Sequence, residues 1–269
     1  MAETEGFSRE EGWALVSALT EEGRDVSPSD ILYGRVRMYQ PTAKRGPRVS
    51  VDTVLLAHFA RVRRGDRVIE MGCAHGAITL IMAKRNDRAR FEGFDINPEL
   101  IDMARENALL NGLGGRVSFF ASDLREHKKN FAPESYDAVV MNPPYDDPGT
   151  SRPSPDEAMA SARHGRTCAL SDVVACAKYL LRNGGRFASM MRANRMGDLF
   201  RLLYEHNVRP KKIRAVHPKP DRPASIVLVE AVRASGDGVT VEPPLFICGS
   251  DGGYTKELLE AYSMPEGEG

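Results

Sequence analysis

The chain has 269 residues, of which 42% are hydrophobic, and this is enough to bury one sizeable core in a single main domain. Its 37 basic and 37 acidic residues give a net charge of zero, so the total charge neither favours nor excludes a nucleic-acid partner. The four cysteines form no CxxC pair and no histidine is spaced for zinc, which argues against a disulfide framework and a metal site. We expect a cytoplasmic protein without membrane contact, since the sequence shows neither a secretory signal nor a membrane-spanning run.

Three regions are expected along the chain. Residues 1–30 form an N-terminal extension, in which Ser8 and Glu11 have the spacing of a helix capping box ahead of apolar residues at helical spacing. This helix either packs on the main domain or acts as a functional arm. Residues 31–262 form the main domain, and residues 263–269 form a flexible tail with an acidic end.

Within the main domain, short apolar runs alternate with helical patterns. In chain order we expect strands at 67–70, 91–95, 117–121, 136–141 and 185–191, helices from 77, from 98 to 112, at 170–182 and at 197–206, and a last pair of strands at 213–217 and 225–230. This alternation predicts an α/β fold with a mostly parallel sheet, helices on both faces and a C-terminal antiparallel hairpin. Ligands of such sheets bind beyond the carboxyl ends of the strands, so chemistry is expected just after each strand.

The first three predicted strands each end near an acidic residue. Glu70 opens the segment EMGCAHG, whose small residues allow a tight turn into the electropositive N-terminus of a helix. An acid ahead of the glycine suits a ligand with an ammonium group rather than the pyrophosphate of a dinucleotide. Asp95 can accept both hydroxyls of a ribose, and Asp123 can accept from an adenine amino group. Each feature alone also fits a turn or cap without ligand, but three at successive strand ends favour a nucleoside-containing ligand.

The strongest signal is Asn142-Pro143-Pro144-Tyr145, directly after the fourth predicted strand. The two prolines fix their backbone angles and prevent a following helix, so the carbonyl groups point outward. The amide oxygen of Asn142 and the carbonyl of Pro143 could then both accept from one NH2 group, while Tyr145 offers a face for stacking. The pattern predicts a site that holds a planar amine with its nitrogen lone pair toward an incoming methyl group.

In this order and spacing, the acid-x-Gly turn, Asp95, Asp123 and the NPPY segment resemble the class I, Rossmann-like methyltransferases of the amino-group type. Residues 39–41, 48–57, 162–164, 216–218 and 243–255 further resemble the bacterial tRNA(Val) adenine-N6-methyltransferases, which modify the adenine beside the anticodon. The resemblance covers residues 31–262. It implies direct in-line transfer of a methyl group from S-adenosylmethionine to the N6 amino group of an adenine in tRNA.

The resemblance also implies roles for individual residues. It places the methionine moiety of the cofactor near Glu70 and Gly72, the ribose at Asp95 and the adenine at Asp123. The full implied cofactor site is Glu70, Gly72, Cys73, Ala74, Gly76, Asp95, Ile96, Ser122, Asp123, Leu124 and Asn142, and the implied catalytic set is Asn142, Pro143, Pro144 and Tyr145. The chain departs from the family's Asp-x-Gly-x-Gly-x-Gly at Glu70, Ala74 and His75, and the methyl group of Ala74 lies where backbone and ligand approach closely.

Basic residues in three segments are candidate RNA contacts. They are Arg35, Arg37, Lys44 and Arg45 in a stretch without acids, Lys211 and Lys212 in a second basic stretch, and Arg163 in the segment after NPPY. The two basic stretches also fit ordinary solvated loops. Other substrates of NPPY methyltransferases stay open, namely a protein glutamine, a guanine N2 of rRNA or an adenine of DNA. A non-catalytic RNA-binding protein on the same fold is also possible.

Overall fold

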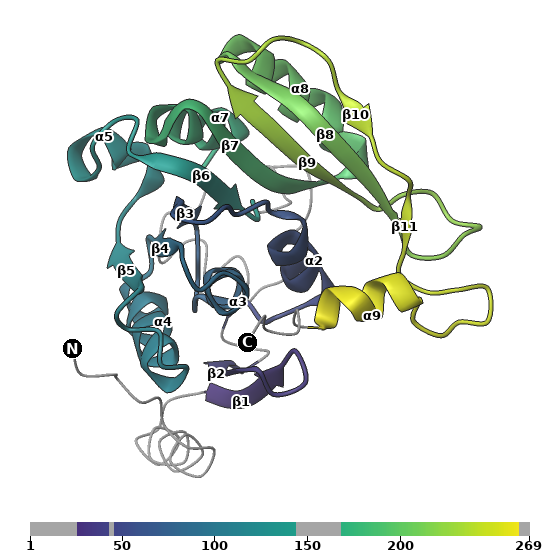
Figure 1. The fold of residues 1–269 in the computed structure, drawn as a ribbon, viewed down its shortest axis with the longest axis horizontal. Helices are drawn as coiled ribbons and strands as arrows, with labels where there is room; N and C mark the ends of the chain where they lie inside the picture. Colours follow the sequence, from purple (N-terminus) through teal and green to yellow (C-terminus); the bar gives the residue numbers. More distant parts are fainter. Residues whose placement is uncertain (1–25, 43–45, 144–167, 264–269) are drawn as a thin grey trace.

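The computed structural model describes residues 26–42, 46–143 and 168–263 (Figure 1). The predicted helix in the first thirty residues and the tail beyond residue 263 therefore lie outside the described residues. Within the described ranges, the structure contains no helix that is both long enough and apolar enough to span a bilayer.

A nine-stranded sheet forms the centre of the fold (Figure 1). Its strands are β3 (Arg67–Met71), β4 (Arg90–Asp95), β5 (Val117–Ala121), β6 (Tyr136–Met141), β7 (Leu181–Arg192), β8 (Val208–His217), β9 (Ile226–Arg233), β10 (Thr240–Val241) and β11 (Leu245–Phe246). They lie in the order β10-β8-β9-β7-β6-β3-β4-β5, and β11 also pairs with β8. Strands β3 to β7 run parallel, whereas β9 runs antiparallel to β7 and β8. The predicted α/β fold and its C-terminal antiparallel hairpin are confirmed.

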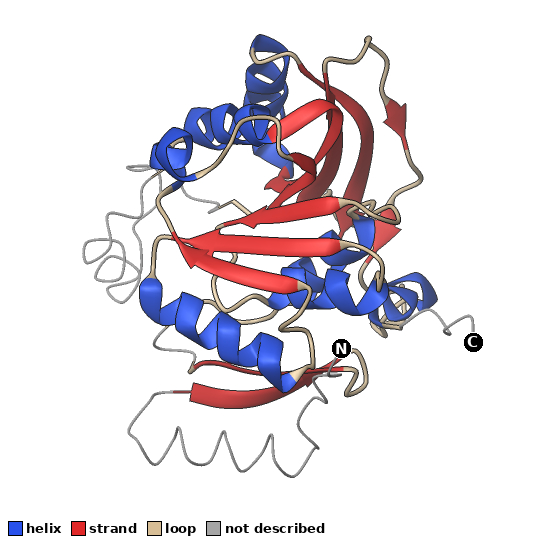
Figure 2. Cartoon of the chain, turned by 60° about the vertical axis from the view of Figure 1, so that its left-hand side comes forward, coloured by secondary structure: helices blue, strands red, loops and turns tan. Residues whose placement is uncertain are grey.

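Helices cover both faces of the sheet (Figure 2). One face packs against α2 (Val51–Phe59), α3 (Ala77–Arg85) and α4 (Pro98–Leu110), and the other against α7 (Leu170–Leu180) and α8 (Met196–Glu205). The short helices η1 (Leu124–Glu126), α5 (His127–Asn130) and η2 (Ala193–Arg195) follow strand ends, and α9 (Lys256–Tyr262) packs on α2. Neighbouring residues such as Val68 and Ile69 belong to opposite hydrophobic clusters, as the alternation of side chains along a strand requires.

The observed bounds of the strands show which strand ends could be predicted from the sequence pattern. Strands β5 and β6 have the predicted bounds because charged or polar residues flank their apolar runs. Strands β7 and β8 begin earlier than predicted. Gly184 lies inside β7 with a φ of 74°, and the basic start of β8 is only half-buried, so neither segment shows the apolar pattern of a strand.

An unpredicted antiparallel hairpin, β1 (Val26–Ile31) and β2 (Val36–Pro41), spans the expected domain boundary at residue 30. Asn107 of α4 and Asn111, the C-cap residue of that helix, hold the second strand of the hairpin. The Asn107 side chain accepts from the Tyr39 N–H at 2.9 Å and donates to the Tyr39 carbonyl at 2.9 Å. Asn111 does the same for Arg37, at 3.0 Å and 2.5 Å. Residues four apart lie on the same face of a helix. The side-chain amides of Asn107 and Asn111 therefore pair with the backbone of β2 as a neighbouring strand would.

Asn107 also connects the hairpin to the turn that follows β3. Its amide nitrogen donates to the carbonyl of His75 at 3.1 Å, and the residue is fully buried. One side chain thus satisfies three backbone groups that water cannot reach. The position of the hairpin and that of the turn are therefore coupled.

Replacing Asn107 with alanine should strip partners from the Tyr39 N–H, the Tyr39 carbonyl and the His75 carbonyl. We expect a loss of roughly 2–4 kcal/mol in the free energy of unfolding, because buried backbone groups without partners are costly. Urea denaturation measures this loss. Asp102→Ala on the same helix removes only an exposed ion pair with Arg105 and should cost less than about 1 kcal/mol. Equal losses in both variants would contradict the bridging role.

Candidate functional site

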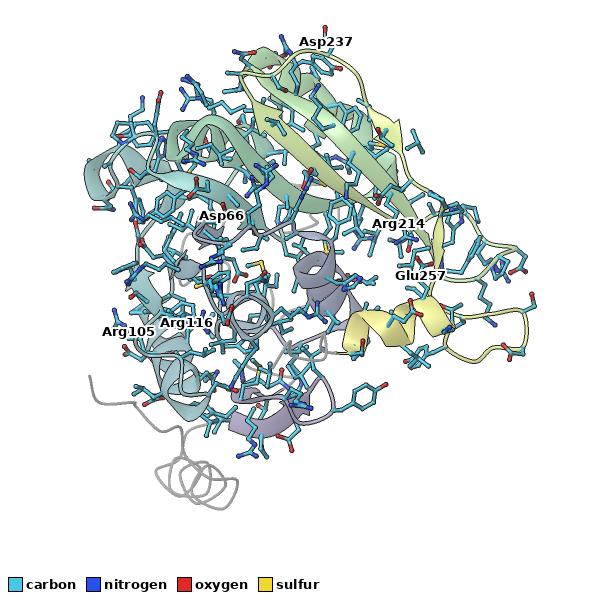
Figure 3. The ribbon with its side chains drawn as sticks, viewed as in Figure 1. Asp66, Arg105, Arg116, Arg214, Asp237 and Glu257 are labelled. Atoms are coloured by element: carbon cyan, nitrogen blue, oxygen red, sulfur yellow. The ribbon has the colours of Figure 1, made fainter. Side chains whose placement is uncertain are left out.

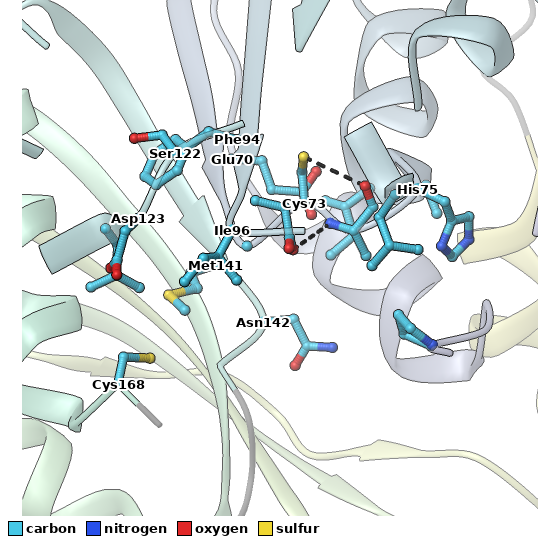
Figure 4. A pocket seen from close by; sticks show the side chains of 18 of the residues that line it. Glu70, Cys73, His75, Phe94, Ile96, Ser122, Asp123, Met141, Asn142 and Cys168 are labelled. Carbon is cyan, nitrogen blue, oxygen red and sulfur yellow. Dashed lines mark hydrogen bonds between the residues drawn. The ribbon is translucent and has the colours of Figure 1, made fainter. Parts of the chain in front are cut away.

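A cavity of about 300 Å³ opens beyond the carboxyl ends of β3, β4, β5 and β6 (Figure 4). This volume lies at the lower end of the range of small-molecule sites. All but one of the predicted cofactor residues line it: Glu70, Gly72, Cys73, Ala74, Asp95, Ile96, Ser122, Asp123, Leu124 and Asn142. The fold therefore brings together residues that lie up to 72 positions apart in the sequence, from Glu70 to Asn142.

The exception is Gly76, which does not line the cavity. It begins α3 with a φ of 87°, and a Cβ atom there would lie 2.8 Å from the ring of Phe119 and 3.2 Å from Ala104. Glycine is required at this position by the left-handed backbone and by close packing of the turn on α4 and β5. The ligand contact that the resemblance implies for Gly76 is not seen in the lining of this cavity.

Glu70 is buried at the base of the cavity and caps the N-terminus of α3. Its Oε2 atom accepts from the Thr79 N–H at 2.8 Å and from the Thr79 hydroxyl. Burial raises the pKa of the Glu70 carboxyl to about 8, the Thr79 hydrogen bonds oppose this shift, and the charge of Asp95 adds to it. Near neutral pH the carboxyl is therefore mostly protonated when no cation lies beside it.

Ala74 and Asp95 fix the turn between β3 and α3. Ala74 has a φ of 49°, in the left-handed region, which costs a residue with a side chain roughly 1–2 kcal/mol. Its N–H donates to Asp95 Oδ2 at 3.0 Å, and Asp95 Oδ1 accepts from the Asn97 N–H at 2.9 Å. Each carboxylate oxygen keeps a further lone pair, so Asp95 can still accept from hydroxyl groups in the cavity.

Asp123 lies at the far end of the cavity, where it caps η1 and pairs with Arg125. The Arg125 side chain donates to both carboxylate oxygens, at distances between 2.5 and 3.0 Å. These hydrogen bonds hold the pKa of the Asp123 carboxyl below its usual range. Beside it, the Ser122 hydroxyl accepts from the Asn130 side chain at 2.9 Å.

Asn142 follows β6, and its side chain lines the cavity (Figure 4). Its amide oxygen is buried and has no hydrogen-bond partner among the residues that the structure describes. An unsatisfied buried acceptor costs roughly 1–3 kcal/mol, so this oxygen is suited to a donor that enters with a ligand. Pro143 is buried beside it, whereas Pro144 and Tyr145 lie outside the described residues.

Several lining residues were not assigned to the cofactor site: Pro47, Arg48, Thr53, His75, Ala77, Ile78, Phe94, Leu100, Arg125, Met141 and Cys168. Phe94 and Met141 each precede a predicted residue, so extending the search one residue back along the strands would have found them. Cys168 comes from a remote segment and carries no local signal. Arg48 and Thr53 belong to residues 48–57, which carry the family resemblance, but neither was assigned to the cofactor site.

Arg48 and His75 form the end of the cavity nearest the hairpin. Arg48 Nη1 donates to the Ser27 hydroxyl at 2.7 Å and to the Pro41 carbonyl at 3.0 Å, which ties the base of the hairpin to the cavity. His75 is buried, and neither ring nitrogen has a partner within the described part of the chain. Burial and, secondarily, Arg48 lower the pKa of His75 to about 4, so this imidazole is neutral.

The predicted RNA contacts that the structure describes, Arg35, Arg37, Lys211 and Lys212, do not line the cavity. Arg35 is exposed at the tip of the hairpin, Arg37 is half-buried in β2, and Lys44, Arg45 and Arg163 lie outside the described residues. Lys211 donates to the carbonyls of Gly236, at 2.5 Å, and Asp237, at 3.1 Å. Lys212 lies 3.3 Å from the Glu242 carboxylate and above the ring of Phe59. A phosphate at either lysine would have to compete with these partners.

Within the ranges that the structure covers, no group of three or more histidine, cysteine or acidic side chains is placed to hold a metal ion. The cavity instead combines the carboxyl groups of Glu70, Asp95 and Asp123 with one amide oxygen that lacks a partner among the described residues, and with an apolar wall that includes Phe94, Ile96 and Met141. Such a lining suits an organic ligand with several hydrogen-bond donors.

The amino-acid sequence of the chain matches a known protein family. The family model described as methyltransferase small domain matches residues 48–195. The tRNA1(Val) (adenine(37)-N6)-methyltransferase of Yersinia enterocolitica is 27% identical to the chain over 217 residues, which cover 80% of the chain and 84% of that protein. These matches confirm the resemblance that the sequence motifs indicated.

Two solved structures show the same fold. A predicted O-methyltransferase from Agrobacterium tumefaciens has a TM-score of 0.65 at 20% identity, with 81% of this chain and 100% of that chain covered. TrmN from Thermus thermophilus has a TM-score of 0.50 at 21% identity, with 67% and 48% covered. At these identities the likeness establishes the fold alone.

The raised pKa of Glu70 predicts a pH dependence of stability. Between an unfolded-state pKa of 4.5 and a folded-state value of about 8, the native state keeps a proton that the unfolded state has lost. The contribution of Glu70 to the free energy of unfolding should therefore fall as the pH rises through this window, by up to about 1.4 kcal/mol per pH unit. Glu70→Gln should remove this contribution, which urea denaturation from pH 5 to pH 8 would measure without ligand.

Glu99→Gln provides a matched control, because the same change is made at an exposed side chain in the first turn of α4. It should leave the pH slope of the wild type unchanged. If Glu70→Gln also keeps that slope, the carboxyl of Glu70 is not the group that titrates.

Proposed function

The chain belongs to the methyltransferase small domain family, and we propose that it transfers the methyl group of S-adenosylmethionine to the N6 amino group of an adenine in tRNA. One observation carries this proposal. The amide oxygen of Asn142 is buried in the cavity and lacks a partner among the described residues, as an acceptor for a substrate NH2 group should. The activity named for the Yersinia relative supports tRNA adenine as the bearer of that amine.

The cavity fits S-adenosylmethionine in the kinds of groups that line it. The carboxyl of Glu70 suits the ammonium of the methionine moiety, and that cation would favour the ionised carboxylate. Asp95 would accept from the ribose hydroxyls, and Asp123 from the adenine amino group. When bound, the cofactor supplies a methyl group on a positively charged sulfur, which makes that methyl strongly electrophilic.

The chain's own part in the reaction is to orient the amine. An exocyclic amine of adenine is a poor nucleophile because its lone pair is delocalised into the ring. The Asn142 amide oxygen and the Pro143 carbonyl would each accept one of its N–H groups, which favours a pyramidal nitrogen and stabilises the positive charge that develops on it. Holding the amine in line with the methyl group and the sulfur can lower the activation free energy by roughly 7–11 kcal/mol at the upper limit. The proton can leave to water afterwards, so the proposal requires no strong base.

An adenine in a folded RNA must leave its stack to reach this cavity. The stacking role predicted for Tyr145 and the phosphate contacts predicted for Arg35 and Arg37 belong to this step. The proposal places the activity in the cytoplasm, where tRNA is available as substrate.

The proposed substrate is tested by supplying labelled S-adenosylmethionine with total tRNA, DNA or a protein substrate. We expect label in tRNA alone and N6-methyladenosine after digestion to nucleosides, as identified by mass spectrometry. Label in DNA or on a protein glutamine would reject tRNA as the substrate. Transfer to none of these, together with no cofactor binding by calorimetry, would support a non-catalytic RNA-binding protein.

Asn142→Ala should lower kcat by about 100-fold or more, because removing one preorganised hydrogen-bond partner of a transition state has an effect of this size. Cofactor affinity should change by less than about threefold, because the proposed arrangement uses the Asn142 amide oxygen for the substrate amine and Asn142 is only one of the eleven residues implied for the cofactor site. Single-turnover kinetics and calorimetry provide the two measurements. Asn86→Ala, at the end of α3 and away from the cavity, is the matched control and should change neither value. Parallel losses of transfer and cofactor binding in Asn142→Ala would contradict the assigned role.

A further inference from the structure

We infer that Arg125 is a positioning residue that holds the Asp123 carboxylate in the orientation needed to recognise the amino group of the cofactor's adenine. Neither the sequence motifs nor the family resemblance pointed to Arg125. The inference rests on the proposed function, because it supposes that S-adenosylmethionine occupies the cavity.

The contacts of Arg125 fix both oxygens of Asp123. Its backbone N–H donates to Oδ1 at 2.9 Å, which closes the cap of η1. Its Nε donates to Oδ1 at 3.0 Å and to Oδ2 at 2.9 Å, and its Nη2 donates to Oδ2 at 2.5 Å. A planar guanidinium that grips a carboxylate at two points restricts rotation of that carboxylate as well as its position.

This grip leaves limited capacity for a ligand. A carboxylate offers about four lone-pair positions, and three N–H groups of Arg125 already point at Asp123. The remaining capacity suits one N–H of an exocyclic amine. A carbonyl oxygen at the same place would bring a lone pair against the carboxylate. The arrangement therefore discriminates adenine from hypoxanthine, whose amino group is replaced by a carbonyl.

The position of Arg125 allows it to hold the Asp123 carboxylate in this orientation while its own side chain stays partly exposed. It lines the cavity together with Asp123, and its side chain is 44% exposed. Asp172, in the first turn of α7, also attracts it electrostatically, and η1 packs on α7. Asp172 is itself fixed, because its carboxylate accepts from the Ala169 N–H at 3.0 Å. Arg125 is thus attracted by two carboxylates that separate elements hold.

The contacts between Arg125 and Asp123 would weaken ligand binding if the adenine had to displace Arg125 from Asp123. Arg125 would then act as a plug, and removing it would tighten ligand binding. The bonding capacity left on Asp123 favours a positioning role, and the sign of the change in affinity decides between the two.

The test measures binding of S-adenosyl-L-homocysteine and S-inosyl-L-homocysteine by calorimetry. Arg125→Ala should weaken binding of the adenosyl ligand by about fivefold, the limit for an exposed ion pair, and binding of the inosyl ligand by less than twofold. The preference for the adenosyl ligand would fall accordingly. Equal weakening of both ligands would indicate a merely structural role, and unchanged or tighter adenosyl binding would also overturn the inference.

Two further variants sharpen this result. Arg125→Lys keeps the charge but not the two-point grip, so it should not restore the preference for the adenosyl ligand; full recovery would mean that charge alone matters and would overturn the orienting role. Lys129→Ala removes an exposed ion pair of 2.6 Å with Glu126 in the same segment, outside the cavity lining, and should leave both affinities unchanged. If the wild type binds neither ligand, the proposed function fails, whereas normal binding with an unaffected Arg125→Ala variant refutes this inference alone.

Discussion

The turn between β3 and α3 is the constraint on which the rest of the site depends. It passes through left-handed conformations at Gly72, Ala74 and Gly76, which an isolated chain would not hold. Three side chains from other positions keep it in place: Glu70 bonds the first turn of α3, Asp95 accepts from the Ala74 N–H, and Asn107 donates to the His75 carbonyl. The cavity exists because these bonds hold the turn open beside the ends of the strands.

This arrangement gives the acidic residues two tasks. Glu70, Asp95 and Asp123 each satisfy backbone N–H groups of the chain and also line the cavity. A substitution at any of the three therefore disturbs the local backbone together with ligand binding, and lost activity alone would not identify a ligand contact. Asn142 differs, since no described residue bonds its amide oxygen, and so its replacement reports more directly on the reaction.

The sequence predicted the strand ends and hence most of the cavity, because an apolar run followed by an acid or by NPPY is a local pattern. It did not predict the β1–β2 hairpin, whose first strand, VSPSDI, has no apolar alternation. That hairpin depends on Asn107 and Asn111, about seventy residues further along the chain. Cys168 also reaches the cavity through tertiary packing, which no short sequence pattern predicts.

The roles of the basic side chains were the hardest feature to predict, because each role depends on ion-pair partners that are distant in the sequence. Arg209 pairs with Asp237, Lys212 with Glu242 and Arg214 with Glu257, and each pair joins β8 to the segment after β9; Figure 3 shows Arg214 beside Glu257. These cations therefore dock the C-terminal segment onto the edge of the sheet. The basic stretch that the sequence suggested for RNA binding therefore forms ion pairs within the fold. Any tRNA phosphate contact along β8 would have to replace these ion pairs.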